Sequence, residues 1–296
     1  MKLNLDYITG LLESKKVENG LYIVATPIGN LSDITINSLK ILSSVDLIIC
    51  EDTRSSKKLT SKYGIKTPLK PFHKFNSFKS IPSLIKKLKT GISVALISDS
   101  GTPIISDPGS DLVHSCDLNN IKVFSLPGPS APIASLVLSN FSKTSFSFRG
   151  FFPRQKKNAL KEIEVLKRSD CPVIYFESPK RIIKTLEFVK VYLGECNITF
   201  VRELTKKHEE VINSSIADLI KVLKIKQKIL GEITIVIEQS KNQYVTEISP
   251  EEILSLSYKL MNDGLNISEI SKKISNDLKI SKRMVYQLLI KKNNYK

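Results

Sequence analysis

The stretch from Ala95 to Gly109 reads Ala-Leu-Ile-Ser-Asp-Ser-Gly-Thr-Pro-Ile-Ile-Ser-Asp-Pro-Gly and indicates the fold of the chain around it. Residues 94–97 form an unbroken apolar run, which is typical of a strand buried on both faces of a parallel sheet. Small, turn-forming residues follow from Ser98 to Pro103, and open α/β sheets bind their ligands at this end of a strand. By itself, the stretch is also consistent with an ordinary loop that needs unusual backbone angles.

Two other stretches have the same organisation. The apolar run 21–25 leads into Thr26-Pro27-Ile28-Gly29-Asn30, and the strand expected at 122–126 ends in Pro127-Gly128-Pro129-Ser130-Ala131. Between the first two turns, Ser32-Asp33 supplies the N-cap of a helix expected at 34–44, and the next apolar run, 45–50, ends at Glu51. Strand, turn and helix repeat up to Leu138, which predicts a parallel sheet with helices on both faces. Because parallel strands end along one edge of a sheet, we expect the three turns to line one crevice that binds a small molecule. None of them is a Gly-Lys-Ser/Thr phosphate loop or a G-x-G-x-x-G fingerprint.

A second block of strands and helices begins near Ser145. Strands are predicted at 146–148, 173–176, 197–201 and 232–237, with helices between them. Polar clusters again follow two of the strands, at residues 177–181 and 202–206. The predicted fold class is therefore α/β, with two α/β domains.

Residues 149–157 read Arg-Gly-Phe-Phe-Pro-Arg-Gln-Lys-Lys, with four cations, two aromatic rings and no acid. This composition is typical of a loop that follows a phosphate backbone and stacks bases on its rings. A solvated loop whose phenylalanines pack inward is the alternative.

The charge balance points to a polyanionic partner. The 296 residues include 45 Lys or Arg against 29 Asp or Glu, a formal net charge of +16 and a pI near 9.5. Such an excess favours nucleic acid, although a genome biased toward Lys, Ile and Asn is an alternative explanation. Hydrophobic content of 41% is that of a globular protein, with length for two domains and a small third.

Cysteine and histidine usage does not favour a metal site. Cys50, Cys116, Cys171 and Cys196 lack paired zinc-ligand spacing and are interpreted as reduced core residues, and the three histidines are scattered. Residues 1–16 have no apolar segment suited to a signal sequence, and nowhere do 18 apolar residues run together. We therefore expect a soluble, cytoplasmic protein without a metal.

The carboxyl-terminal segment predicts a small helical domain. A polar linker from Gln239 to Tyr244 precedes a helix with Ser249 as N-cap and Pro250 at its first position, which Gly264 ends. Residues 267–274 and 281–290 are two short amphipathic helices with a tight polar turn between them, the layout of a helix-turn-helix. Nine Lys or Arg against five Asp or Glu give this segment a net charge of +4, which permits a nucleic-acid role.

The predicted domain division has five parts: an N-terminal extension (1–19), an α/β domain (20–142), a second α/β domain (143–240), a linker (241–248) and the helical domain (249–296).

Several motifs together resemble the bacterial small-subunit ribosomal RNA (cytidine 2′-O) methyltransferases, which belong to the tetrapyrrole methylase superfamily of S-adenosylmethionine enzymes. They are residues 21–35, Glu51-Asp52-Thr53-Arg54, the turn 98–103, residues 127–130, Glu177-Ser178 with Arg181, and residues 202–206. The resemblance covers about residues 20–238. It implies S-adenosylmethionine in the cleft between two α/β domains, a homodimer, and a tail like that family's helix-turn-helix appendage.

The resemblance also implies the residues that contact the cofactor. Those carried over are Ile28, Thr102, Ile105, Ser130, Ala131, Phe176, Glu203, Glu232 and Thr234, and the turns add Gly29, Asp99, Gly101 and Pro103. The family commonly has Ala where Ser100 stands, which places an extra hydroxyl near the pocket. It often has an acid near residues 73–77, where this chain is more basic, so no catalytic role is assigned there.

The implied reaction is an in-line attack of a ribose 2′-oxygen on the sulfonium methyl, which needs positioning and a base but no metal. Candidate bases are the carboxylates that follow predicted strands, Glu51, Asp52, Glu177 and Glu203, with ion pairing or capping as the alternative for each. Arg54, Arg181 and Arg202 are expected to position phosphates or to orient the acids. The expected RNA contacts are Arg149, Arg154, Lys156, Lys157 and Arg181, together with the C-terminal domain.

Two other functions remain open from the sequence. A methyltransferase for a small tetrapyrrole would share the cofactor turns but has no use for the net charge of +16. A transcriptional regulator would use the α/β body to sense a ligand and the tail to read DNA.

Overall fold

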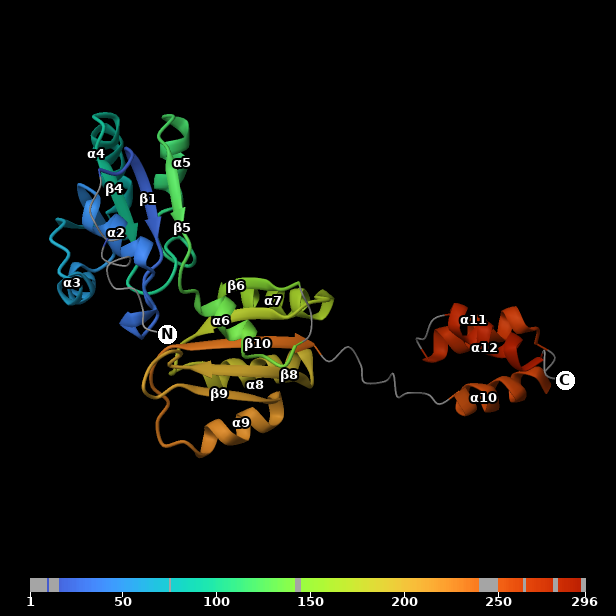
Figure 1. Cartoon of the computed structure of the whole chain (residues 1–296). Coiled ribbons are helices and arrows are strands. Elements are labelled where there is room, and N and C mark those ends of the chain that lie inside the picture. Colours follow the sequence, from blue (N-terminus) through green and yellow to red (C-terminus); the bar gives the residue numbers. More distant parts are fainter. Residues whose placement is uncertain are drawn as a thin grey trace. The chain divides into compact units, whose positions relative to one another are not determined.

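The structure is a computed structural model that describes Gly10 and residues 16–74, 76–141, 145–239, 250–262, 265–278 and 282–293. The chain forms two compact units, Met1–Gln239 and Ser240–Lys296, both drawn in Figure 1. Most of the predicted N-terminal extension, the linker 241–248, Ser249, Gly264 and the turn 279–281 lie outside the described residues.

The first sheet of unit one is parallel, as predicted. Its strand order is β3-β2-β4-β1-β5, and every neighbouring pair is parallel. Figure 1 labels β4, β1 and β5 of this sheet. The expected strands are present and the short β3 was not predicted. The strands are β1 (Gly20–Val24), β2 (Leu47–Cys50), β3 (Leu69–Pro71), β4 (Ser93–Ile97) and β5 (Val123–Leu126).

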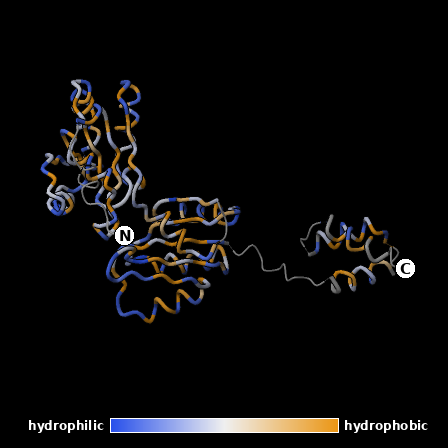
Figure 2. Tube along the Cα trace, viewed as in Figure 1, coloured by the Kyte–Doolittle hydropathy of each residue, from blue (hydrophilic) through white to orange (hydrophobic). Residues whose placement is uncertain are grey.

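Alternate residues of the central strands β1, β2 and β4 enter two separate cores, which explains their unbroken apolar runs. Tyr22 and Val24 pack in the core that also contains α2 and α3, whereas Leu21 and Ile23 pack in the core of α4 and α5. Figure 2 shows the resulting apolar strands. The helices are α2 (Ile36–Ser44), α3 (Thr53–Lys62), α4 (Ser77–Lys89) and α5 (Ser110–Leu118).

The start of α2 differs from the simplest expectation from the sequence, which would make Ser32 and Asp33 its N-cap. These residues belong instead to a 3-10 turn, η1 (Leu31–Asp33), whose N-cap is Asn30. Thr35 is the N-cap of α2, and its hydroxyl accepts a hydrogen bond from the Ser38 amide at 3.0 Å.

The second sheet is mixed, with the order β6-β7-β10-β8-β9. Only β6 and β7 are parallel, and the other pairs are antiparallel. Strand β9 was not predicted; it pairs with β8 as an antiparallel neighbour. The strands are β6 (Ser147–Phe151), β7 (Val173–Glu177), β8 (Cys196–Arg202), β9 (Glu210–Ser215) and β10 (Ile233–Gln239).

One core joins this sheet to three helices, α7 (Lys156–Arg168), α8 (Ile182–Leu193) and α9 (Ile216–Ile225). Helix α6 (Ala131–Val137), which follows the turn after β5, packs against β7 and β10. The turn after β5 therefore leads directly into a helix that contacts the second sheet.

The prediction of a single basic loop at 149–157 was wrong. Arg149 and Gly150 belong to β6, Lys156 and Lys157 begin α7, and only the short connection between these elements is irregular.

Unit two contains three described helices, α10 (Pro250–Asn262), α11 (Ile267–Leu278) and α12 (Lys282–Asn293). They share a small core that includes Ile253, Ile270 and Val285. The two helices expected near 267–274 and 281–290 correspond to α11 and α12.

Candidate active site

The structure brings together the three turns that follow β1, β4 and β5. Thr26 and Gly101 exchange backbone hydrogen bonds of 2.9 and 3.1 Å. The Thr26 hydroxyl also donates to the Ser98 carbonyl at 3.2 Å, and the Thr102 hydroxyl donates to the Pro129 carbonyl at 3.1 Å. Hydrogen bonds thus link the turn after β4 to the turns after β1 and β5, and the three turns lie together at one edge of the sheet.

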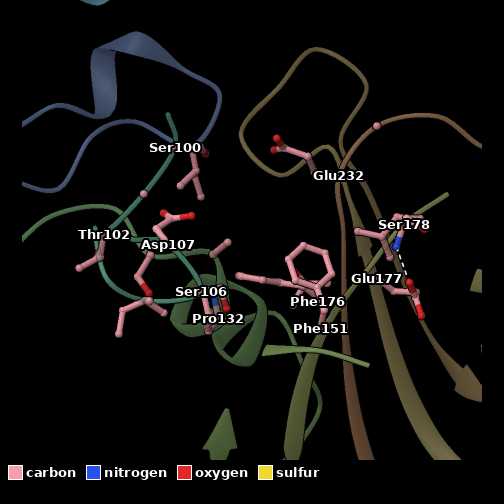
Figure 3. Close-up of a pocket in the computed structure, with 18 of the residues that line it drawn as sticks. Ser100, Thr102, Ser106, Asp107, Pro132, Phe151, Phe176, Glu177, Ser178 and Glu232 are labelled. Atoms are coloured by element: carbon pink, nitrogen blue, oxygen red, sulfur yellow. Dashed lines mark hydrogen bonds between the residues drawn. The ribbon is translucent and has the colours of Figure 1, made fainter. Parts of the chain in front are cut away.

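A cavity of about 320 Å³ opens at this edge and is lined from both sheets (Figure 3). That volume falls in the range of about 300–1,000 Å³ typical of small-molecule sites. Its lining includes these cofactor candidates: Ile28, Gly101, Thr102, Ile105, Ser130, Ala131, Phe176, Glu232 and Thr234. It also includes these residues, which the sequence analysis did not assign to the cofactor: Ser100, Ser106, Asp107, Pro132, Phe151, Ser178, Pro179, Gly231 and Ile233.

Aromatic rings form the wall that the second sheet contributes. Phe176 lies edge-on to Phe151 and Phe148, with ring centroids 5.6 and 4.9 Å away. Phe151 is 58% exposed, so this apolar wall remains available to a ligand.

Four of the expected cofactor residues lie outside this cavity. Gly29 and Asp99 line a second cavity of about 370 Å³, and Pro103 and Glu203 do not line either one. The two cavities share Ile28, Ser100 and Glu232, so they are adjacent. Ser100 therefore lies at their common wall.

Asp107 is the main functional candidate that the sequence analysis missed. Burial, assisted by the negative charges of Glu51 and Asp99, raises the pKa of its carboxyl to about 6, although a hydrogen bond from Ser98 opposes the shift. The signal available in the sequence was an acid within the loop that follows β4, but Asp107-Pro108-Gly109 was interpreted only as a turn. A carboxyl with a pKa near neutrality is well suited to exchange a proton.

Glu51 and Asp52 follow β2 but line neither cavity. Burial and the charge of Asp99 raise the pKa of Glu51. Asp52 accepts hydrogen bonds from the Arg54 side chain at 2.8 to 3.3 Å, which lowers its pKa to about 2. Asp52 also caps α3 through the Arg54 amide at 2.8 Å. These contacts favour a capping and ion-pairing role for Asp52 and Arg54 over a role in catalysis.

Glu177 lines the first cavity, but its carboxylate is fully buried and both of its oxygens already have partners. It accepts hydrogen bonds from the Ser178 amide at 2.7 Å and the Thr185 hydroxyl at 2.6 Å, and Arg181 lies 3.2 Å away. Figure 3 shows the Glu177 carboxylate directed away from the phenyl rings. This geometry favours a positioning role over proton transfer.

Glu203 and Arg202 also have partners nearby. Glu203 accepts hydrogen bonds from Lys206 at 2.9 Å and from the Glu232 amide at 3.0 Å, and the Lys206 contact is the main reason that its pKa is lowered. Arg202 donates to Glu210 at 2.9 Å. These contacts hold the loop beside the cavity, and a carboxylate with a lowered pKa is a weak base.

The expected RNA contacts divide into two groups. Arg149 donates to Glu162 at 2.8 and 3.1 Å, and Tyr175 donates to the same carboxylate at 3.0 Å. Arg181 is committed to Glu177 and to the Phe152 carbonyl. Arg154, Lys156 and Lys157 are exposed at the start of α7 and, among the described residues, make no ion pair with an acid.

The described residues contain neither a metal-holding cluster nor a membrane-spanning helix. No group of three or more His, Cys, Asp or Glu side chains is placed to hold a metal ion. No helix within the described ranges has both the length and the apolar character needed to cross a membrane.

Comparison with known proteins identifies the family. The sequence pattern of the tetrapyrrole (corrin/porphyrin) methylases matches residues 20–220. The chain belongs to the tetrapyrrole methylase family. It is 44% identical to the ribosomal RNA small subunit methyltransferase I of Thermotoga maritima over 217 residues, which are 73% of this chain and 97% of that protein. It is 40% identical to the Bacillus subtilis protein of the same name over 272 residues, which are 90% and 92% of the two chains. The resemblance predicted from the motifs and the methyltransferase activity are thus confirmed.

Solved structures of this methylase fold agree. Uroporphyrin-III-C-methyltransferase from Thermus thermophilus has a TM-score of 0.53 at 16% identity, covering 75% of this chain and 93% of that chain. A diphthine synthase has a TM-score of 0.58 at 14% identity, covering 74% and 89%. A Thermus uroporphyrin-III C-methyltransferase complexed with S-adenyl homocysteine has a TM-score of 0.54 at 13% identity, covering 73% and 96%. At this identity the likeness concerns the fold, and it confirms the predicted α/β class.

Proposed function

We propose that this tetrapyrrole methylase transfers a methyl group from S-adenosylmethionine to the 2′-oxygen of a cytidine ribose in small-subunit ribosomal RNA. The methylase family and a structural neighbour complexed with S-adenyl homocysteine support the predicted cofactor, and the relatives named ribosomal RNA small subunit methyltransferase I support the RNA class. The ribose oxygen and the cytidine come from the motif resemblance. The observation that carries the proposal is the pair of adjacent cavities, one suited to the donor and one open beside it.

The residues of the first cavity fit the donor. Ile28, Ile105 and Phe176 offer an apolar wall for an adenine ring, and the Thr26–Gly101 bridge fixes the turn that carries Ile28. S-adenosylmethionine supplies a methyl group on a positively charged sulfur, and the half-buried Asp107 carboxylate in the cavity wall would complement this charge. Gly101 lets the backbone approach the ligand closely.

The second cavity would hold the acceptor nucleotide. Because Ile28 and Ser100 line both cavities, a nucleotide in the second cavity would lie next to the donor. In-line transfer requires this closeness. Lys58 lines it and, among the described residues, has no acidic partner, so its ammonium group is available to a phosphate. Lys206 lines it too but is shared between Glu203 and Glu232.

Asp107 is our proposed base. The lowered pKa values of Asp52 and Glu203 and the engaged oxygens of Glu177 make these acids weaker candidates. Glu51 has a raised pKa but does not line the donor cavity. Asp107 combines a pKa of about 6 with a place in the cavity wall. It would accept the proton of the 2′-hydroxyl as the oxygen bonds to the methyl group.

Methyl transfer to unmodified small ribosomal subunits tests the function. Subunits would come from a Bacillus subtilis strain that lacks its relative of this chain, and the donor would carry a radiolabelled methyl group. A 2′-O-methyl group blocks alkaline cleavage of the adjacent phosphodiester, so mapping identifies the ribose. Label in a base, or transfer to precorrins but not to subunits, would contradict the proposal.

The finer parts of the assembly are also proposals. We propose that the two α/β domains divide between residues 142 and 143 and that the linker 241–248 joins the second of them to the helical domain. The two separate sheets and the separate helical unit support this division. We also retain a donor-binding cleft between the two α/β domains, a homodimer, and a helix-turn-helix role for α11 and α12 in contacting RNA. A cytoplasmic location would follow from the ribosomal substrate. Sedimentation equilibrium of the pure protein measures its molar mass and so tests the dimer. The molar mass of a monomer would contradict this proposal.

A further inference from the structure

A third cavity, on the second α/β domain, is lined by cations and aromatic rings. It has a volume of about 400 Å³, and none of the described residues that line it is acidic. Its cations are Arg154, Lys156, Arg181 and Lys184, and its aromatic residues are Phe152, Phe188 and Tyr192. Positive charge combined with aromatic surface is typical of proteins that bind single-stranded nucleic acid.

One face of α8 builds half of this cavity. Lys184, Phe188 and Tyr192 follow one another at intervals of four residues, so they share that face. The rings of Phe188 and Tyr192 have centroids 4.6 Å apart. Tyr192 is 37% exposed, so its ring offers a surface on which a base can stack.

The connection between β6 and α7 forms the other half, and Arg181 fixes it. Its guanidinium donates to the carbonyls of Phe152 and Pro153 at 2.9 and 3.3 Å. Because Glu177 neutralises Arg181, three cations remain for a ligand. Arg154, Lys156 and Lys184 are exposed and, in the part of the chain that the structure describes, make no ion pair with an acid.

The third cavity adjoins the donor cavity. Glu177 lines the donor cavity, while its partners Arg181 and Thr185 line the third one. The contacts of 3.2 Å from Arg181 and 2.6 Å from Thr185 therefore bridge the wall between them. A strand of RNA that places one nucleotide beside the donor would have a neighbouring part within reach of this cavity.

We propose that this cavity binds a nucleotide of a single-stranded RNA segment, with its base on Tyr192 and its phosphates near Lys156, Lys184 and Arg154. The inference rests on the proposed function for its choice of RNA over other polyanions. It adds a second anchoring point on the substrate, separate from the nucleotide that receives the methyl group.

A tryptophan probe tests the stacking contact directly. The chain contains no tryptophan, so the Tyr192→Trp variant has a single tryptophan, which can be excited at a wavelength that tyrosine does not absorb. Phe78→Trp on α4 provides a matched control at an 87% exposed position. Titration of the full chain with a short single-stranded oligoadenylate should quench the Tyr192→Trp emission saturably and leave the Phe78→Trp emission nearly unchanged. Binding of the labelled oligonucleotide, seen by anisotropy, without such quenching would overturn the proposal.

Charge removal tests the phosphate contacts and does not depend on the probe folding. Lys156→Gln with Lys184→Gln should reduce the slope of log K against log salt by about 1.4 for the oligonucleotide, and Tyr192→Ala should weaken binding roughly 5- to 150-fold. Lys66→Gln with Lys89→Gln removes the same charge outside the cavities and should leave binding nearly unchanged. Equal losses in both pairs would overturn the proposal. Quenching by an acidic peptide but not by RNA would assign the cavity to a protein partner and would also overturn it.

These measurements separate the two proposals. Oligonucleotide binding does not require methyl transfer. Quenching of the Tyr192→Trp emission without methyl transfer to subunits would therefore support the third cavity as an RNA site and contradict the proposed function. Transfer to subunits without any quenching would do the reverse.

Discussion

Thr26 and Gly101 are joined by two backbone hydrogen bonds, 2.9 and 3.1 Å long, that connect the turn after β1 to the turn after β4. Gly101 has a φ of +80°, a conformation that favours glycine. The bridge holds Ile28 against Gly101, and both line the donor cavity. The shape of that cavity therefore depends on one left-handed residue in the middle of the Ser-Asp-Ser-Gly-Thr-Pro turn.

Gly101→Ala should weaken donor binding about tenfold or more, because a Cβ would lie 3.3 Å from the Ile28 side chain. It should also lower the free energy of unfolding by about 1–2 kcal/mol through backbone strain. Gly64→Ala is the control, with a φ of +68° and no atom within 4 Å of its Cβ. Titration calorimetry and urea unfolding should give both variants a similar stability loss but only Gly101→Ala an affinity loss. Equal donor affinity would contradict this role of the bridge.

Asp107 should make stability fall as the pH rises from about 4 to about 6. Its pKa is about 6 in the folded chain against an ordinary value of 3.8, so the folded state binds more protons than the unfolded state in this window. Asp107→Asn should therefore stabilise the chain at pH 7, by about 1–2 kcal/mol after allowance for solvent screening. Asp111→Asn, the same change at an exposed site, is the control. Parallel stability curves for Asp107→Asn and the unaltered chain would refute the prediction.

Donor affinity should change with pH in the opposite direction. A positive sulfonium favours the ionised Asp107, so affinity should rise between pH 5 and pH 7, by about tenfold for each unit by which the donor lowers the pKa. The Asp107→Asn variant should show a flat profile by calorimetry. A rise that persists in this variant would assign the titration to another group.

Glu177→Gln should cost stability more than catalysis. The buried carboxylate balances Arg181, so its neutralisation should lower the free energy of unfolding by about 2–4 kcal/mol. Glu164→Gln removes an exposed partner of Lys167 and should cost at most about 0.5 kcal/mol. At a temperature where both variants are folded, kcat should stay within about threefold of the unaltered chain. A hundredfold fall in kcat would instead identify Glu177 as the base.

Arg149→Met should leave RNA affinity within about twofold and lower the free energy of unfolding by about 1–2 kcal/mol. The reason is that Glu162 and Tyr175, which share a hydrogen-bonded cluster with Arg149, would lose their cation. Lys157→Gln, an exposed cation nearby, is the comparison. Salt-dependent binding curves and thermal unfolding measure the two effects. A loss of RNA affinity without a loss of stability would restore Arg149 as an RNA contact.

The first sheet is the part of the fold that the sequence predicts best. Local apolar runs predicted β1, β2 and β4, because strands buried on both faces need no polar alternation. The run at 122–126 also predicted β5, although β5 is a partly exposed edge strand. The edge strand β3 and the antiparallel β9 were not predicted. Residues of β9 alternate between partly buried and exposed positions, and the strand is defined by its pairing with β8.

For the site, the sequence by itself determined the family, the three turns and about half of the donor-cavity lining, because turn-forming residues follow each parallel strand at one edge of a sheet. Only the tertiary structure decided which acids are free to act. Asp107 has a raised pKa because the fold partly buries it near the charges of Glu51 and Asp99. Asp52, Glu177 and Glu203 accept hydrogen bonds from partners that their spacing does not reveal in full. The cation-lined third cavity likewise exists only where α8 meets the start of α7. Desolvation and pairing depend on contacts across the fold, so they are decided only when the chain has folded.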